Sequence, residues 1–220
     1  MEKSVYPTIT CDISDVCASI EQGTPYEYVL TGPSPNSREH LKYIVLEYLK
    51  QIGKDKSYNL LCLCMEEIIS NSVKANIKRA YFLSNNLDIN NKEDYEHGMK
   101  NFKEAGVSCS KDKELIEKVH SLGLYVTITF HIKNDTLYIT TRNNSVISAQ
   151  ELERINKKLK LSENQSPEDI FMNSIDTTEG AGLGIIMITK IMRQISKAED
   201  CFSIRADDQD TITELKITKA

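Results

Sequence analysis

The sequence predicts an α+β fold, a two-layer sandwich with a mixed, mainly antiparallel sheet and helices on one face. Three patterns predict it. Long helical periodicities dominate the chain before residue 123, strand patterns follow at 124–132 and 136–141, and Lys133-Asn134-Asp135 forms a tight turn between these two strands. Helices that come first, followed by antiparallel strands with helices between them, are typical of this class.

Length and composition indicate one globular domain spanning 1–220, with an N-terminal extension at 1–35 and an insertion at 84–123. The net charge of −5 argues against a nucleic-acid backbone or an acidic membrane surface as the partner. The N-terminus has no apolar leader segment, and no run of about 18 apolar residues occurs, so we expect a cytoplasmic protein without a membrane segment. The six cysteines form no CxxC pair, which favours reduced thiols over disulfides or a zinc site.

The first part of the chain predicts three helices and one strand. A short helix at 12–21 precedes a strand at 26–31, which a Gly-Pro turn ends. The apolar residues of 38–52 form one stripe at helical spacing, and a glycine closes that helix. The long helix at 60–82 contains neither Gly nor Pro, and the short turn before it predicts antiparallel packing of the two long helices.

The pattern loosens after the long helix, and the remaining elements are shorter. They are, in order, helices at 92–102 and 111–122, the two strands of the hairpin, a helix at 149–161 capped by Ser148, a helix at 183–196, and strands at 201–206 and 211–218. The segment 162–179 has the composition of a loop with one helical turn.

A line of polar residues runs along one side of the helix at 60–82. Glu67, Asn71, Lys74 and Lys78 are spaced i, i+4, i+7 and i+11, which stacks them on one face. Two interpretations are open. One is a solvated face, which is the commoner meaning of such a stripe, and the other is a carboxylate, an amide and an amine directed into one cavity.

A second signal is the run Gly180-Ala181-Gly182-Leu183-Gly184 at the start of the last long helix. Glycines at alternate positions allow close backbone approach, and a helix start offers free N–H groups and the positive end of the dipole, which suit a phosphate. The run is neither a P-loop nor the dinucleotide fingerprint, because it lacks the GK[ST] ending and a leading strand. Tight packing at a helix start explains such a run equally well.

Together these segments resemble the GHKL superfamily, whose Bergerat-type ATP-binding fold is shared by DNA gyrase, heat-shock chaperone ATPases, sensor histidine kinases and mismatch-repair ATPases. The family's N-box, an acid followed four residues later by Asn and then by a basic residue, is similar to Glu67 to Lys74. Its second glycine box, GxGLG, matches Gly180 to Gly184 in full. Its closing strand, which a Thr begins, resembles Thr211–Ile217, and the resemblance extends over roughly Arg38 to Thr218.

The resemblance implies a role for each matched residue, with Mg²⁺ and ATP or ADP as the ligands. Asn71 would bind Mg²⁺ through its amide oxygen, and Lys74 would offset phosphate charge. Glu67 stands where the ATP-hydrolysing members keep their general base, so it is the candidate catalytic residue. The remaining expected ATP-binding residues are Asn143, Gly180, Gly182, Leu183, Gly184 and Thr211.

The first glycine box, usually DxGxG at the end of a strand, departs from the family pattern. It should fall at 143–147, where Asn143 replaces the Asp that accepts a hydrogen bond from the adenine amino group, and Ser145 replaces a glycine. An Asn still accepts through its oxygen, but loss of a charged acceptor costs about 1–3 kcal/mol, a tenfold to hundredfold loss in affinity. An ordinary turn accounts for 143–145 equally well.

Two long connections are candidates for contact with a protein partner. The insertion at 84–123 is absent from compact kinase members of the superfamily, and long connections usually carry a function or a partner surface. The segment 148–179 corresponds to the ATP lid, with a plain surface loop as the alternative. None of the histidines has the neighbours of a phosphoacceptor, so autophosphorylation on histidine is not expected.

The sequence leaves three functions open. The first is a stand-alone ATP-binding regulatory domain of the GHKL type, similar to the anti-sigma-factor serine kinases, which acts as a protein serine kinase or an ATPase switch. The second is a degenerate GHKL fold that acts as a non-catalytic protein-interaction module. The third is an ATPase of a larger machine with Glu67 as its base, which ranks last because this chain is too short to add a transducer domain.

Overall fold

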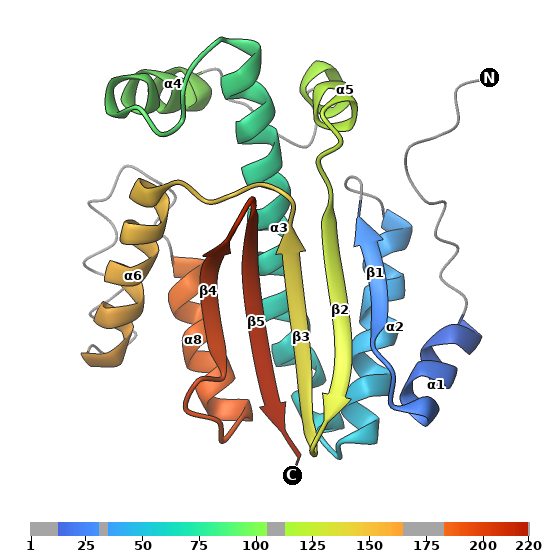
Figure 1. The fold of residues 1–220 in the computed structure, drawn as a ribbon. Helices are drawn as coiled ribbons and strands as arrows, with labels where there is room; N and C mark the ends of the chain where they lie inside the picture. The colour runs from blue at the N-terminus through green and yellow to red at the C-terminus, as the bar shows by residue number, and fades with distance from the viewer. Residues whose placement is uncertain (1–12, 31–34, 105–112, 165–182, 220) are drawn as a thin grey trace, which may run out of the picture.

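The computed structural model describes residues 13–30, 35–104, 113–164 and 183–219, which form a sheet with helices packed against one face (Figure 1). Its elements are, in chain order, α1 (Ile13–Gln22), β1 (Tyr26–Leu30), α2 (Pro35–Gln51), a 3-10 turn (Asp55–Ser57), α3 (Tyr58–Ser84), α4 (Lys92–Glu104), α5 (Lys113–Ser121), β2 (Val126–Lys133), β3 (Thr136–Asn143), α6 (Ala149–Asn164), α8 (Leu183–Ile195), β4 (Phe202–Asp207) and β5 (Asp210–Thr218). The α+β class is therefore confirmed, and the helices and strands expected in these ranges occur within a few residues of their predicted bounds.

The sheet has five strands in the order β1-β2-β3-β5-β4. Each pairing between neighbouring strands is antiparallel, so the sheet is more uniform than the mixed sheet that the sequence predicts. The β2–β3 hairpin turns through Asn134 and Asp135, which have φ angles of 49° and 57°. Positive φ at both central residues suits the right-handed twist of the flanking strands, and Asn and Asp tolerate it better than most residues.

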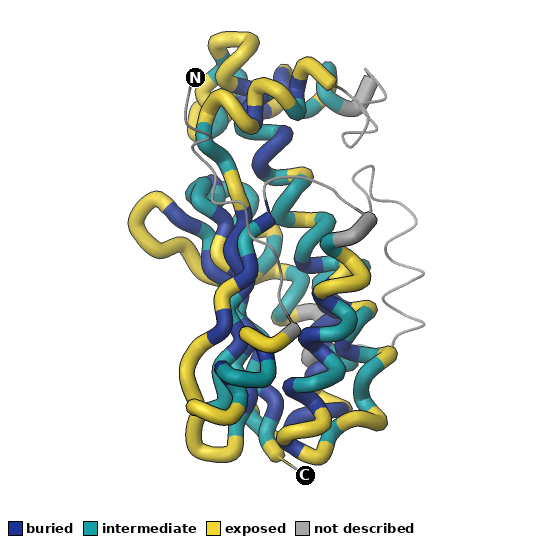
Figure 2. The backbone as a smooth tube through the Cα atoms, turned by 90° about the vertical axis from the view of Figure 1, so that its right-hand side faces the viewer, coloured by how far each residue is buried: buried dark blue, intermediate teal, exposed yellow. Residues whose placement is uncertain are grey.

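The main hydrophobic core lies between the sheet and helices α2, α3 and α8 (Figure 2). Alternate residues of β1, β2, β3 and β5 point into it, as the period of two requires, and they meet the apolar stripes of the helices. One specific contact is the stacking of Tyr48 on Phe130, with ring centroids 5.3 Å apart. This core holds α3 flat against the sheet, which fixes the direction of the polar stripe on α3.

The C-terminal half of α3 extends past the end of the sheet and carries α4 and α5 (Figure 1). A second apolar cluster joins α3 to α5 there, with Ile77, Ala80, Leu115 and Val119 as its buried members. The contact with α4 is close, because a Cβ added to Gly98 would lie 2.6 Å from the ring of Phe82. The insertion at 84–123 is therefore packed onto α3 wherever the structure describes it.

Among the helices in the described ranges, none is long and apolar enough to span a bilayer.

Candidate functional site

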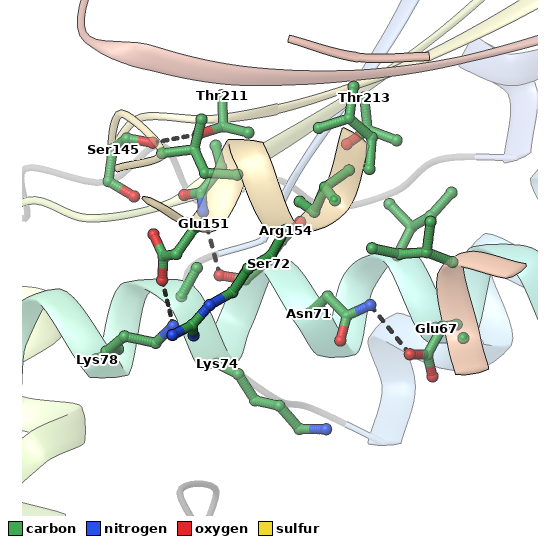
Figure 3. Close-up of a pocket in the computed structure, with 18 of the residues that line it drawn as sticks. Glu67, Asn71, Ser72, Lys74, Lys78, Ser145, Glu151, Arg154, Thr211 and Thr213 are labelled. Atoms are coloured by element: carbon green, nitrogen blue, oxygen red, sulfur yellow. Dashed lines mark hydrogen bonds and ion pairs between the residues drawn. The ribbon is translucent and has the colours of Figure 1, made fainter. Parts of the chain in front are cut away.

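A cavity of about 400 Å³ follows α3 along the side that carries the polar stripe (Figure 3). Its walls come from α3, the end of β3, the start of β5, the first turn of α8, and parts of α4, α6 and β4. Elements that lie far apart in the sequence therefore converge on one concave site, the usual setting for a small-molecule site.

The four residues of the stripe, Glu67, Asn71, Lys74 and Lys78, all line this cavity, which favours the second interpretation of the stripe. Asn71 donates a hydrogen bond from Nδ2 to Oε1 of Glu67 at 3.0 Å. This bond fixes the amide so that Oδ1 of Asn71 remains available to a cation. No cluster of three or more His, Cys, Asp or Glu side chains that could hold a metal ion occurs in the parts of the chain that the structure describes.

Asn143 ends β3 and lines the same cavity, with only 3% of its surface exposed. Its Nδ2 donates to the backbone carbonyl of Ser72 at 3.2 Å, which joins β3 to α3. Its Oδ1 is buried and accepts no hydrogen bond. A buried acceptor without a donor costs about 1–3 kcal/mol, so this oxygen suits a ligand that brings an N–H group.

Hydrogen bonds to other segments hold the turn that follows β3. Ser145 donates from Oγ to Oδ1 of Asn76 at 3.0 Å. The hydroxyl of Thr211 donates to the backbone carbonyl of Ser145 at 2.7 Å, so its proton is already used within the protein. Thr211 nevertheless lines the cavity, beside Thr213 on the same strand.

Gly184 in the first turn of α8 lies against Glu67. A Cβ added to Gly184 would lie 1.9 Å from Oε1 of Glu67, so a larger residue at this position would have to displace the end of the Glu67 side chain. The carboxylate of Glu67 lies beside the start of α8, where the helix dipole favours a negative charge (Figure 3). Leu183 begins α8 but does not line the cavity, and Gly180 and Gly182 lie outside the described residues.

Two cations of α3 and one carboxylate of α6 form a buried ion cluster at the far end of the cavity. Glu151 pairs with Lys78 through Oε1, and with Arg79 through Oε2 at 3.2 Å. Burial raises the pKa of Glu151, but the attraction of both cations and the hydrogen bonds from Lys78 and Ser148 outweigh it and lower this pKa to about 2. Ser148 caps α6, as expected, by accepting from the backbone N–H of Glu151 at 3.3 Å.

The cavity is positively charged although the chain carries a net charge of −5. Its lining contains two carboxylates, Glu67 and Glu151, and five cations, an excess of three positive charges. The five cations are Lys74, Lys78, Arg79, Arg154 and Lys158. Concentration of positive charge in a concave site of an acidic protein favours an anionic ligand.

Sequence reasoning missed the contribution of α4, which it treated as a partner surface. Tyr95, Met99 and Phe102 of α4 line the cavity and form an apolar wall. They are spaced i, i+4 and i+7, so helical periodicity at 92–102 was the one signal that could have indicated a shared face. Nothing in that periodicity identifies what the face packs against.

Comparisons with known proteins give limited information about function. No model of a known family matches the sequence. Over 213 residues, or 96% of this chain, the sequence is 27% identical to an uncharacterised protein of Treponema pallidum (strain Nichols), and the chain spans 41% of the length of that relative. The structure is similar to a chain in the crystal structure of the SiaB–SiaC complex from Pseudomonas aeruginosa, with a TM-score of 0.45 and 13% identity over 95% of this chain and 99% of that chain.

Proposed function

We propose that this chain is an adenine-nucleotide-binding regulatory domain of the GHKL type, which binds ATP or ADP with Mg²⁺ in the cavity along α3. The single observation that carries the proposal is the buried Oδ1 of Asn143, which lacks a donor in a cavity with three excess positive charges. An adenine amino group supplies such a donor, and a polyphosphate supplies the matching negative charge.

The residues present fit this ligand. The adenine would lie at Asn143, and the phosphates would lie along α3 towards Lys74 and Asn71. Asn71 would hold the Mg²⁺ ion through Oδ1, because its Nδ2 is fixed by Glu67. Bound Mg²⁺ supplies charge neutralisation for the phosphates, while the side chains of this chain orient the nucleotide.

We favour a switch or a protein serine kinase over a fast ATPase. Glu67 is the residue that would activate water in a hydrolysing member. Its carboxylate already accepts a hydrogen bond from Asn71 and packs against the first turn of α8. A carboxylate held in this way is better placed to position Asn71 than to move towards a water molecule.

Thermal unfolding with added nucleotide tests the proposal. A ligand that binds the folded state raises the melting temperature, and at 100 times its Kd it adds about 2.7 kcal/mol of stability. We expect millimolar ADP or ATP with Mg²⁺ to raise the melting temperature of the wild-type protein, and to raise it less in Asn143→Ala. Unchanged melting at millimolar nucleotide would refute nucleotide binding.

A second candidate is a non-catalytic protein-interaction module that keeps the fold without the nucleotide. A contact within the protein favours it at one position, because the Thr211 hydroxyl donates to the carbonyl of Ser145. Thr211 thus has a structural reason to be present. Steady ATP turnover that disappears in Glu67→Ala would rule this candidate out.

A further inference from the structure

The cavity continues beyond the residues that the nucleotide would occupy. Asn143 contacts α3 at Ser72, and Glu67 lies five residues before that point, about 7.5 Å along the helix axis. Lys78 lies six residues after it, about 9 Å in the opposite direction. Asn143 is therefore near the middle of the cavity, and phosphates held at Asn71 and Lys74 would end four residues before Lys78, about 6 Å along the helix axis.

That second end, which we call the α4–α6 end, has an apolar wall. It is lined by Tyr95, Met99 and Phe102 of α4 and by Ile155 of α6. Arg154 ties the two helices together, because its Nη1 donates to the hydroxyl of Tyr95 at 3.1 Å and its guanidinium lies 5.3 Å from the centre of the Tyr95 ring. The wall is therefore formed before any ligand binds.

The same end carries more positive charge than its one carboxylate offsets. Glu151 is shared between Lys78 and Arg79, and Nη1 of Arg79 is buried without an acceptor. Lys158, one turn after Arg154 on α6, is half-buried in the lining and forms no ion pair with any residue in the described ranges. An unsatisfied guanidinium nitrogen and an ammonium without an ion-pair partner beside an apolar wall suit an acceptor that the described residues do not supply.

We propose that the α4–α6 end is a separate subsite for a small aromatic or apolar molecule that carries a phosphoryl or carboxylate group. The apolar body would lie against Tyr95, Met99 and Phe102, and the anion would lie between Lys158 and Arg79. Charged hydrogen bonds in such a partly buried site fix the anion more strongly than at an open surface. This subsite does not depend on nucleotide binding at Asn143.

Phenyl phosphate, which joins an aromatic ring to a phosphoryl group, is the probe that tests the subsite. Titration of the full chain, followed by protein NMR shifts or calorimetry, should give saturable binding. Benzyl alcohol and inorganic phosphate each lack one half of the probe and should bind at least about tenfold more weakly. Equal binding of inorganic phosphate would contradict the role of the apolar wall.

Two lysine variants locate the probe. Lys158→Ala should weaken phenyl phosphate binding about tenfold, since it removes an unpaired cation from the lining. Lys160→Ala removes an exposed lysine from the same helix outside the lining and should leave binding unchanged. Binding that survives Lys158→Ala would overturn the proposal, and so would the absence of binding to the wild-type protein.

A third variant separates this proposal from the proposed function. Asn71→Ala should weaken ATP binding and leave phenyl phosphate binding unchanged, because Asn71 lies seven residues before Lys78, about 10.5 Å along the helix axis. Loss of phenyl phosphate in Asn71→Ala would place the probe in the nucleotide site and refute a separate subsite. If the protein binds ADP but not phenyl phosphate, the subsite proposal is wrong and the nucleotide proposal stands. If it binds phenyl phosphate but not ADP, the nucleotide proposal is wrong and the subsite proposal stands.

Discussion

At the scale of single residues, the contacts of Asn143 account for an amide side chain at the end of β3. Its two polar atoms face different partners, because Nδ2 donates to Ser72 while Oδ1 remains free to accept. Sequence spacing located this position at the end of a strand. It could not indicate the bond to Ser72, because the two residues are 71 apart in the chain and meet only when β3 packs on α3.

Asn143→Asp should therefore destabilise the protein at neutral pH by about 1–3 kcal/mol, because a carboxylate would face the Ser72 carbonyl without a proton between them. Burial raises the pKa of such a carboxyl above the value of about 3.9 in the unfolded chain. The free energy of unfolding lost in Asn143→Asp is then largest above the raised folded pKa, and this loss shrinks as the pH falls towards about 3.9. Urea melts of both proteins at pH 8 and pH 5 measure it, and equal deficits at the two pH values would contradict the account.

At the scale of elements, α6 is fastened to α3 by one carboxylate. The side chain of Glu151 is only 15% exposed, and both of its ionic partners come from α3. The sequence predicted α6 and its cap, since those depend on neighbouring residues. The cross-helix pairing was not predictable, because any of several glutamates in that segment could have faced α3.

Glu151→Gln should cost about 3 kcal/mol of stability at pH 7, because it leaves Lys78 and Arg79 buried without their counter-charge. The pKa of Glu151 in the folded protein, about 2, lies below its ordinary value of 4.5. The stability that the charged Glu151 gives the wild type is therefore fully present above pH 4.5 and is lost as the pH falls towards 2. The control Glu153→Gln changes an exposed carboxylate paired with Lys157, where solvent screens the pair and the loss of stability should be much smaller. Equal losses in the two variants, measured by chemical denaturation, would count against the buried cluster.

The packing of α4 on α3 can be tested at Gly98, which lies against Phe82. Gly98→Ala should destabilise the protein by about 1–2 kcal/mol, because the new methyl group would meet the Phe82 ring at 2.6 Å and the gain in helix propensity of about 1 kcal/mol only partly offsets the overlap. Glu96→Ala, at an exposed position of the same helix, should have little effect. A Gly98→Ala variant that melts above the wild type would show that α4 is not packed as described.

At the scale of the whole molecule, the fold was largely predictable and the site only in part. Helical stripes, the Asn134-Asp135 turn and strand alternation are local signals, and each of them predicted its element. The stripe from Glu67 to Lys78 also predicted one wall of the cavity. The wall from α4 escaped prediction, because it depends on how an insertion packs against α3, and no local pattern encodes that packing.

Calorimetric titration of the protein with ATP, with and without Mg²⁺, shows whether the cavity along α3 binds a nucleotide. We expect saturable binding that requires Mg²⁺ and becomes at least about tenfold weaker in Asn71→Ala. Asn59→Ala makes the same replacement at an exposed position of α3 outside the cavity and should bind like the wild type. No saturable heat at millimolar ATP, or equal binding by both variants without regard to Mg²⁺, would contradict this expectation.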